Sequence, residues 1–203
     1  EKIAEITHTS LGEYEIYSEF EKVSSEWQKV QMPFIEVAFR TEDTLRLGDI
    51  KPILEIINKN IIIYTRLFMN PYVAGIKDDI IKELNDLEYI SHVLEAWKIF
   101  QSNWNILSAL FSSEEARSSM PQHNNRIVGI QRKWSPIGKH ALNDTRVIAA
   151  CNYPQLHATF TEMNQALESI LCSLGKFLDT KRTAIPRLFF IKNEEVLLFL
   201  STN

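Results

Sequence analysis

The sequence predicts a mainly α fold, an elongated stack of antiparallel helical bundles with a short β-hairpin near residues 34–47 and a short strand near 187–191. Apolar residues recur every three or four positions over several long stretches, which is the spacing of one face of an α-helix. Only six glycines and seven prolines occur in 203 residues, so little of the chain is left for linkers. With 45% hydrophobic and 24% charged residues, the composition is that of a packed globular protein.

The first expected helix covers residues 11–31. One face carries apolar side chains at steps of four, three, four and three: Ile16, Phe20, Val23, Trp27 and Val30. Glutamate, lysine and serine fill the other faces, which indicates a helix with one buried side. Pro33 is expected to end this helix, because the α conformation is disfavoured for the residue before a proline.

The next segments, FIEVAF at 34–39 and TLRLGD at 44–49, are expected to pair as a hairpin that turns at residues 41–43. The second segment alternates apolar and polar residues cleanly and the first does so in part, as strands do. Asp49 is a good N-cap for a second helix that ends near Asn70 and Pro71. The predicted buried face of that helix consists of Ile50, Leu54, Ile57, Ile61, Tyr64 and Phe68.

The longest expected helix runs from about residue 77 to residue 112. Its apolar stripe includes Leu84, Leu87, Leu94, Trp97, Phe100, Trp104, Leu107 and Phe111. Trp97 and Trp104 stand two helical turns apart on nearly the same side, and each tryptophan buries about 150–250 Å². The stripe could line a ligand pocket, but its helical spacing favours a buried core.

A further helix is expected up to about Leu142, interrupted near Ser135 and Pro136, with a short segment at 144–150 before Pro154. Its inward side chains are Ile127, Ile130 and Trp134. The helix after it, over residues 155–181, carries a heptad seam flanked by Leu171 and Leu178. That seam consists of Leu156, Phe160, Met163, Leu167, Ile170, Leu174 and Phe177.

The helix that carries the seam is followed by a stretch that is first charged and then apolar. Lys181 and Arg182 fall in its last turn, where positive charge suits the helix dipole. Together with Arg187 they could bind an anion, but the dipole explains them better. Pro186 prevents further winding, RLFFI at 187–191 can form a short buried strand, and Asn193 is expected to cap a final helix.

Charge, cysteines and chain ends limit the class of protein. A formal net charge of −4 gives no general attraction for nucleic acid or anionic membranes, so neither is expected as a partner. Cys151 and Cys172 form no disulfide or zinc pattern, and no apolar run approaches the ~20 residues of a membrane span. We therefore expect a soluble intracellular protein.

The two ends of the sequence suggest a segment of a longer polypeptide. The sequence starts at Glu1 without a methionine and ends just after VLLFL, so we expect it to come from a longer chain.

No reaction centre is evident in the sequence. The nearest approach to a phosphate loop, GIQRKWSPIGKH at 129–140, has eight residues between its glycines and His140 where a hydroxyl is required. The five histidines do not follow a metal-ligand spacing. Glu194 and Glu195 are better explained as charges in a first helical turn than as a general acid and base. Catalytic, cofactor and metal residues are therefore predicted to be absent.

Four segments, in order, resemble dynein heavy chains. They are IAEITHTSLGEYEIYSEFEKVSSEWQKV at 3–30, EAWKIFQSNWNILSALFSS at 95–113, MPQHNNRIVGIQRKW at 120–134 and LESILCSLGKFLDTKRTAIPRLFFIKNEEVLLFLS at 167–201. The last is similar to a long helix ending in Leu-Glu-x-Lys-Arg, followed by Phe-Pro-Arg-Phe and a Leu-rich helix. Ile185, Leu188, Gln122, His123 and the pair 129–130 depart from the family pattern, which makes this a divergent member.

The resemblance implies a non-catalytic segment of the linker, the arched helical element that lies across a ring of AAA+ ATPase modules. The whole chain, 1–203, would be the N-terminal half of that linker, with about 1–75 holding the first helix, hairpin and second helix, and about 76–203 a long-helix bundle ending at a junction. ATP and Mg would belong to the AAA+ ring of the full-length protein. The linker would turn changes in the ring into the power stroke towards microtubule minus ends.

The resemblance also implies partners and a location. The AAA+ ring of the same chain would be contacted directly, and intermediate chains, light chains and microtubules through other regions. MPQH at 120–123 and MNQALESI at 163–170 resemble axonemal more than cytoplasmic dyneins, so a cilium or flagellum axoneme is expected within the cytoskeleton and cytoplasm. Two alternatives stay open: a free-standing helical scaffold that binds partner helices through its Trp and Leu seams, and an enzyme with a hidden site.

Two groups of residues are expected to matter most. The structural anchors are Trp27, Trp97, Gln101, Trp104, Phe111, Trp134 and Phe177. The junction residues are Lys181, Arg182, Pro186, Arg187, Phe189 and Phe190.

Overall fold

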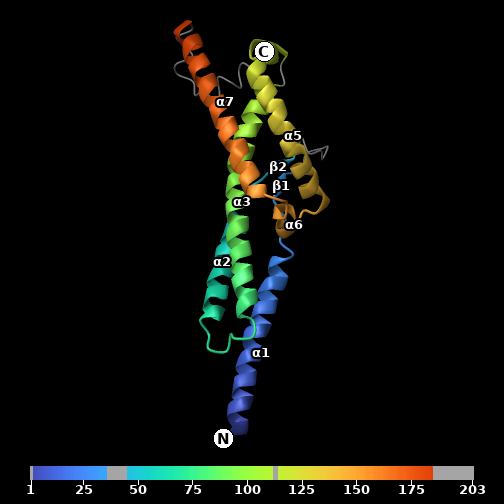
Figure 1. Cartoon of the computed structure of the whole chain (residues 1–203), viewed down its shortest axis with the longest axis vertical. Coiled ribbons are helices and arrows are strands. Elements are labelled where there is room, and N and C mark those ends of the chain that lie inside the picture. The colour runs from blue at the N-terminus through green and yellow to red at the C-terminus, as the bar shows by residue number, and fades with distance from the viewer. Residues whose placement is uncertain (1, 36–44, 112–113, 185–203) are drawn as a thin grey trace.

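The computed structural model describes residues 2–35, 45–111 and 114–184, and it confirms a mainly α, elongated architecture (Figure 1). Its elements are α1 (Lys2–Trp27), β1 (Phe34–Ile35), β2 (Arg46–Leu47), α2 (Lys51–Phe68), α3 (Lys77–Leu110), α4 (Glu114–Ser119), α5 (Pro121–Asn143), α6 (Val147–Cys151) and α7 (Leu156–Ala184). Among these residues, no helix is both long and apolar enough to cross a membrane.

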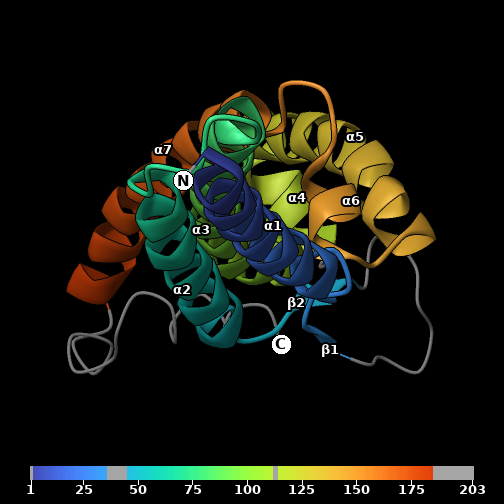
Figure 2. The same cartoon turned by 90° about the horizontal axis from the view of Figure 1, so that it is seen from below.

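Helix α3 is the spine of the molecule. It contacts α2 along its first half, and α6, α7 and β2 further along (Figure 1). Seen from below, α7, α3 and α5 form an arch, with α1 and α2 in front of it (Figure 2). Successive long helices alternate in direction, so α3 and α7 run the same way after α5 has brought the chain back (Figure 1).

A short antiparallel hairpin lies between α1 and α2, as predicted. Phe34 pairs with Leu47 and Ile35 pairs with Arg46, while the expected turn at 41–43 lies outside the described residues. The backbone N–H of Gly48 donates to the carbonyl oxygen of Pro33 at 2.7 Å. A Cβ at Gly48 would lie 2.5 Å from that oxygen, so only glycine allows this close approach.

The end of α1 differs from the prediction. The helix ends at Trp27 rather than continuing to residue 31, and Pro33 is not what stops it. The reason is tertiary: beyond a turn at Gln28, the backbone of Val30 and Met32 forms hydrogen bonds with a distant segment near Thr145. Local periodicity cannot reveal that competing set of partners.

The start and the buried face of α2 also differ from the prediction. Ile50, not Asp49, occupies the N-cap position, although the Asp49 carboxylate accepts a hydrogen bond from the backbone N–H of Lys51 at 3.1 Å. The fully buried residues of the helix are Ile53, Ile57, Asn60, Tyr64 and Leu67. The predicted Leu54, Ile61 and Phe68 are only partly buried. The helices α1 and α3 instead cover the residue that precedes each of these three in the sequence.

The predicted interruption of α5 does not occur, and Pro136 lies inside a continuous helix. Pro136 is exposed, while Trp134 and Ile137 are buried. The hydrogen bond that proline cannot make is therefore lost on the solvent side, where water can replace it, and the packed inner face keeps the helix intact. The six-residue helix α4 has no counterpart in the prediction from the sequence.

Helix α7 extends to Ala184, so Lys181 and Arg182 do fall in its last turn; their side chains, like that of Phe177, are outside the described part of the structure. The remaining junction residues Pro186, Arg187, Phe189 and Phe190, with the expected strand at 187–191 and the final helix, also lie outside it. The heptad seam up to Leu174 is confirmed. Its six described members are buried: Leu156, Phe160, Met163, Leu167, Ile170 and Leu174.

Candidate functional site

An aromatic cluster lies where α3, α5, α7 and the hairpin meet. The Trp97 ring has its centroid 5.3 Å from that of Phe160, 5.7 Å from that of Trp134 and 5.9 Å from that of Phe34. Phe100 completes the cluster, with centroids 5.0 Å from Trp134 and 5.4 Å from Phe160. Aromatic rings at these separations attract one another beyond the effect of burial alone. The cluster therefore fastens three helices and β1 to one point.

The other predicted anchors whose side chains the structure describes are also buried. Trp27 at the end of α1, and Trp104 and Phe111 at the end of α3, belong to the core. Gln101 is buried too, and its side-chain amide Nε2 donates to the side-chain oxygen Oδ1 of Asn105 at 2.8 Å. These side chains are packed in the core, which agrees with the structural role that the sequence predicts for them.

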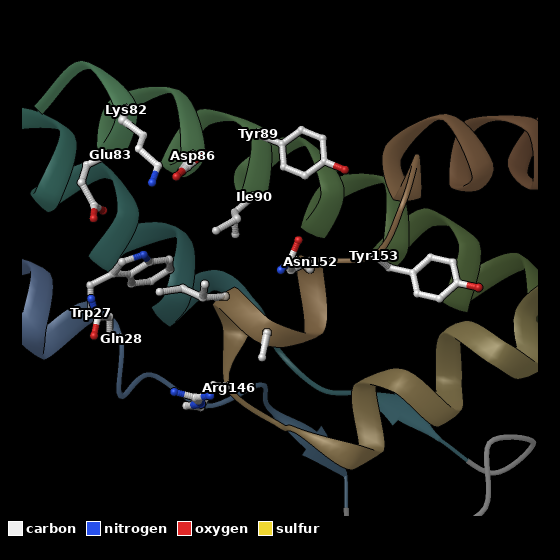
Figure 3. Close-up of a pocket in the computed structure, with 13 residues that line it drawn as sticks. Trp27, Gln28, Lys82, Glu83, Asp86, Tyr89, Ile90, Arg146, Asn152 and Tyr153 are labelled. Carbon is white, nitrogen blue, oxygen red and sulfur yellow. The ribbon is translucent and has the colours of Figure 1, made fainter. Parts of the chain in front are cut away.

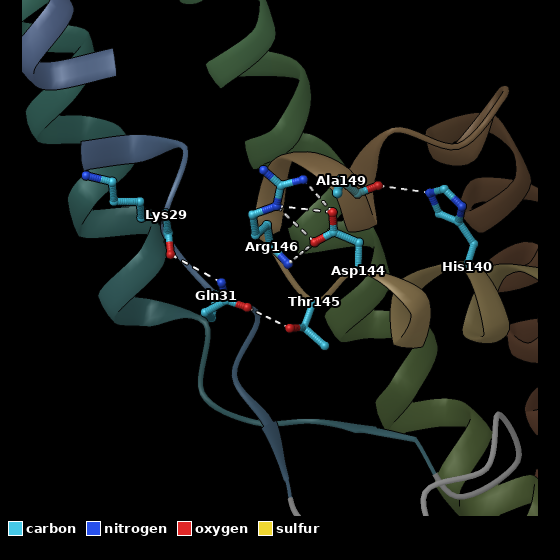
Figure 4. Close-up of polar contacts among 7 residues, drawn as sticks. All are labelled: Lys29, Gln31, His140, Asp144, Thr145, Arg146 and Ala149. Atoms are coloured by element: carbon cyan, nitrogen blue, oxygen red, sulfur yellow. Dashed lines mark hydrogen bonds and ion pairs between the residues drawn. The ribbon is translucent and has the colours of Figure 1, made fainter. Parts of the chain in front are cut away.

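A bridge of backbone hydrogen bonds joins the end of α1 to the start of α6, and we call it the α1–α6 bridge. The Met32 N–H donates to the Thr145 carbonyl at 2.7 Å, and the Val147 N–H donates to the Val30 carbonyl at 2.9 Å. Between them, the Thr145 hydroxyl donates to the Gln31 side-chain oxygen at 2.6 Å (Figure 4). The bridge links residues more than a hundred positions apart, so it ties the end of α1 directly to the start of α6.

Asp144 and Arg146, the residues on either side of Thr145, form an ion pair at the start of α6. The Arg146 guanidinium donates to both carboxylate oxygens of Asp144, and the Arg146 backbone N–H donates to the same carboxylate at 3.1 Å (Figure 4). These hydrogen bonds lower the pKa of Asp144 to about 2 and raise that of Arg146. The pair therefore flanks Thr145, whose backbone carbonyl and hydroxyl both belong to the bridge. Sequence reasoning missed it, because it lies in a short non-periodic segment.

Replacing Arg146 with glutamine is expected to return the pKa of Asp144 from about 2 towards its ordinary value of 3.8, because the side-chain hydrogen bonds that favour the carboxylate are lost. Since the folded-state pKa is depressed, the stabilisation is present above the unfolded pKa and is lost as pH falls through the folded value. A carboxyl-carbon NMR titration of Asp144 measures this shift. Arg132→Gln, an equal charge change on the exposed side of α5, should leave the titration unchanged.

Beside the bridge is an open groove of about 800 Å³. Side chains of α3 form one wall and residues around α6 the other, with Trp27 at the end of α1 (Figure 3). Cys151 lines the groove, but burial raises the pKa of its thiol to about 12. The thiol therefore stays protonated at neutral pH and is a poor nucleophile.

Two contacts of histidine side chains lie outside the bridge and the aromatic cluster. His92 and His157 face each other across α3 and α7 with ring centroids 6.1 Å apart. The His140 ring nitrogen Nε2 lies 2.9 Å from the Ala149 carbonyl, which ties α5 to α6 (Figure 4). Within residues 2–35, 45–111 and 114–184, no group of three or more His, Cys, Asp or Glu side chains is placed to hold a metal ion.

Comparison with known proteins agrees with the resemblance seen in the sequence. The family described as dynein heavy chain, N-terminal region 2, matches residues 1–203. Dynein axonemal heavy chain 3 of Mus musculus is 30% identical over 201 residues, which are 99% of this chain and 5% of that protein. Dynein axonemal heavy chain 1 of Homo sapiens is 27% identical over 201 residues, again 99% of this chain and 5% of that protein.

A more distant organism gives the same result. The dynein-1-alpha heavy chain of the flagellar inner arm I1 complex of Chlamydomonas reinhardtii is 28% identical over 208 residues, which cover 100% of this chain and 4% of that protein. The chain thus spans about 5% of the length of the curated relatives it matches. Because the family match covers every residue, the chain belongs to the dynein heavy chain family, as its N-terminal region 2.

Proposed function

We propose that the chain is the N-terminal half of the linker of an axonemal dynein heavy chain, a non-catalytic lever that couples changes in the AAA+ ring of the same polypeptide to the power stroke. ATP and Mg would be bound by that ring. Intermediate chains, light chains and microtubules would be contacted through other regions of the motor. The axonemal and flagellar names of the relatives support a location in the cilium or flagellum axoneme.

The observation that carries the mechanical role is the uninterrupted α3. Its 34 residues correspond to a rod of about 50 Å at 1.5 Å per residue. Buried side chains occur along its whole length, from Ile80 to Leu110. Its first half packs on α2 and its second half on α7, so both parts of the proposed division, about 1–75 and about 76–203, share one rigid element.

The first helix is tied to its neighbours α2 and α6 by two sets of contacts. The Arg66 side chain of α2 pairs with Glu19 of α1, and the α1–α6 bridge holds the other end of α1 against the long-helix bundle. A load applied to α1 would therefore reach α6 without passing through a flexible linker. The scaffold alternative has less support, because the Trp and Leu seams that it would offer to partner helices are buried within this chain.

The test uses Val147→Pro in the full-length heavy chain. Val147 is the first residue of α6, where proline is tolerated, and Arg146 before it has φ −65° and ψ 139°, which proline permits. The substitution thus removes the N–H that bonds to the Val30 carbonyl while leaving α6 able to form. Val30 is partly buried, and the loss of one such hydrogen bond costs about 0.5–1.5 kcal/mol. We expect ATP turnover to persist and microtubule gliding velocity to fall several-fold.

Val147→Ala is the matched control, since it shortens the side chain but keeps the N–H. If the alanine variant slows gliding as much as the proline variant, lost packing rather than the bridge is responsible. If the proline variant glides normally, the α1–α6 bridge does not carry load. A parallel loss of ATP turnover and gliding would point to general damage to the motor and would count against a specific coupling role.

A further inference from the structure

A second groove lies between α5 and α7, and we call it the α5–α7 groove. Helix α5 lines it with Arg126, Gly129, Ile130 and Lys133, and Met163 of α7 forms part of its floor. Its volume is about 220 Å³, which is below the roughly 300–1,000 Å³ of small-molecule sites. The groove therefore suits one or two side chains of another protein better than a free small molecule.

Gly129 is exposed in the middle of α5, where glycine destabilises a helix relative to alanine. At Gly12 and Gly48, a Cβ would lie 2.7 Å and 2.5 Å from the nearest atoms, so packing within the chain explains both of those glycines. At Gly129, a Cβ would meet no atom within 4 Å, and the φ angle is not positive. Neither packing in the described part of the chain nor backbone conformation requires glycine there. A glycine also serves where another backbone approaches closely, and Gly129 fits that use.

The charge of the groove favours an acidic occupant. Helix α5 has no aspartate or glutamate, although the chain as a whole has a net charge of −4. Its lysine and arginine residues are Arg126, Arg132, Lys133 and Lys139. In the groove, Lys133 is already paired with Glu162 of α7 at 2.6 Å. Arg126 donates to the neutral Ser169 hydroxyl at a long 3.4 Å and has no ion pair in the described part of the chain, so a carboxylate can still match it.

The floor of the groove is apolar. Ile130 is 5% exposed and Met163 is 1% exposed, and Ala166 beside them is partly buried. Arg126 and Lys133 stand two turns apart on one side of α5, about 10.5 Å along the axis. A helix that lies in a groove presents residues at i, i+3, i+4 and i+7 to it, so its carboxylate and its apolar side chains can meet Arg126 and the floor together. Nucleic acid is bound mainly through rows of phosphates and does not need such a floor.

We propose that the α5–α7 groove is a docking site for an acidic amphipathic helix of a separate protein. The backbone of that helix approaches Gly129, and one of its carboxylates accepts hydrogen bonds from the Arg126 guanidinium. Its apolar side chains pack on Ile130 and Met163. The assignment depends on the open space at the glycine, the charge of Arg126 and the apolar floor, and it holds whether or not the chain acts as a linker.

The test measures binding of a fluorescently labelled peptide, acetyl-(Ala-Glu-Glu-Ala-Leu-Leu-Ala)₂-Glu-Glu-amide, to the 203-residue chain by fluorescence anisotropy. We expect a Kd on the order of 100 μM, and binding at least about tenfold weaker when lysine replaces every glutamate of the peptide. Gly129→Leu should weaken binding about tenfold by filling the groove. It should not lower the urea midpoint of unfolding, because the new side chain starts in open space. Arg126→Gln should weaken binding about fivefold, and by less in about 0.5 M NaCl.

Two matched variants change α5 outside the groove lining. Val128→Leu enlarges the side chain next to Gly129, and Arg132→Gln makes the same charge change as Arg126→Gln; each should change the Kd less than about twofold. Unchanged binding by Gly129→Leu, equal binding of the lysine peptide, or no binding up to about 1 mM peptide would overturn the proposal. So would tighter binding of a single-stranded oligonucleotide that Arg126→Gln abolishes, which would make the groove a nucleic-acid site. Self-association that Gly129→Leu abolishes would also overturn it, since the occupant would then be a second copy of this chain.

Discussion

Replacing Trp97 with alanine is expected to lower the free energy of unfolding by about 3–5 kcal/mol. Trp97 is 0% exposed and lies between Phe34, Trp134 and Phe160. Its removal takes away one of the two rings that α3 contributes at the meeting point of α5, α7 and β1, the other being Phe100. Part of the cost comes from lost burial and part from the cavity, because close-packed neighbours relax only partly. Urea denaturation followed by far-UV circular dichroism measures the change.

Two matched variants separate this effect from a general sensitivity of α3. Ile99→Ala changes a side chain that is 49% exposed on the same helix, so its cost should stay within about 0.5 kcal/mol. Trp97→Phe keeps an aromatic ring and removes the indole N–H, which has no hydrogen-bond partner in the described structure. It should therefore cost much less than alanine. A Trp97→Ala cost no larger than that of Ile99→Ala would show that the cluster does not hold the fold.

The long helices are predictable because their buried faces repeat with the helical period. In α7, each described seam residue from Leu156 to Leu174 is buried as expected, since one face of a rod meets a single neighbour over its whole length. In α2 the same reasoning is right for Ile50, Ile57 and Tyr64. At the other three positions it selects the residue after the one that is buried. There, apolar residues occupy several sides, and only the positions of α1 and α3 decide which side is covered. Exposed Ile62 shows that apolar character alone does not fix burial in this helix.

The anchors can be predicted from the sequence, whereas the residues of the α1–α6 bridge cannot. Trp97, Trp104 and Trp134 are identifiable from the sequence because large aromatic residues on a helical stripe are almost always core. Gln31 and Thr145 are not, because an isolated pairing of two loops has no period and no characteristic composition. The contact is created only when α5 returns the chain beside the end of α1. Backbone N–H and C=O groups beyond the end of a helix need hydrogen-bond partners whatever their side chains are. That requirement is the reason to look for such a bridge.

Asn164 is a polar residue within the buried contact between α3 and α7. It is only 8% exposed, and its side-chain amide donates to the Ala96 carbonyl at 2.9 Å. Its side-chain oxygen has no partner in the described structure. The position therefore accepts a hydrogen-bond donor facing α3 and offers nothing to stabilise a negative charge. A change from amide to carboxylate tests this arrangement with almost no change of shape.

Asn164→Asp is expected to lower the free energy of unfolding by about 3–5 kcal/mol at pH 7, the scale for an uncompensated buried charge. The carboxylate would face the Ala96 carbonyl oxygen, which repels it, and would lose its hydration. Both effects raise the folded-state pKa of the new carboxyl above its unfolded value of about 3.9. Between these two values the folded state binds more protons than the unfolded state, so stability falls as pH rises. Below about pH 4 the protonated acid can donate to Ala96, and most of the loss disappears.

The pH dependence distinguishes a buried charge from simple disruption of packing. Gln165→Glu makes the same charge change on the exposed side of α7, and its cost should stay within about 0.5 kcal/mol at every pH. Asn164→Leu removes both the donor and the unpartnered oxygen, so it should cost less than the aspartate at pH 7 and show no pH-dependent difference from the unmodified chain. Urea denaturation at pH 4 and pH 7 supplies the comparison. An aspartate penalty that is the same at both values would mean that the loss comes from packing and not from a buried charge. A penalty within about 0.5 kcal/mol at both values would mean that water reaches Asn164, and that the α3–α7 contact is looser than the continuous seam of a rigid lever requires.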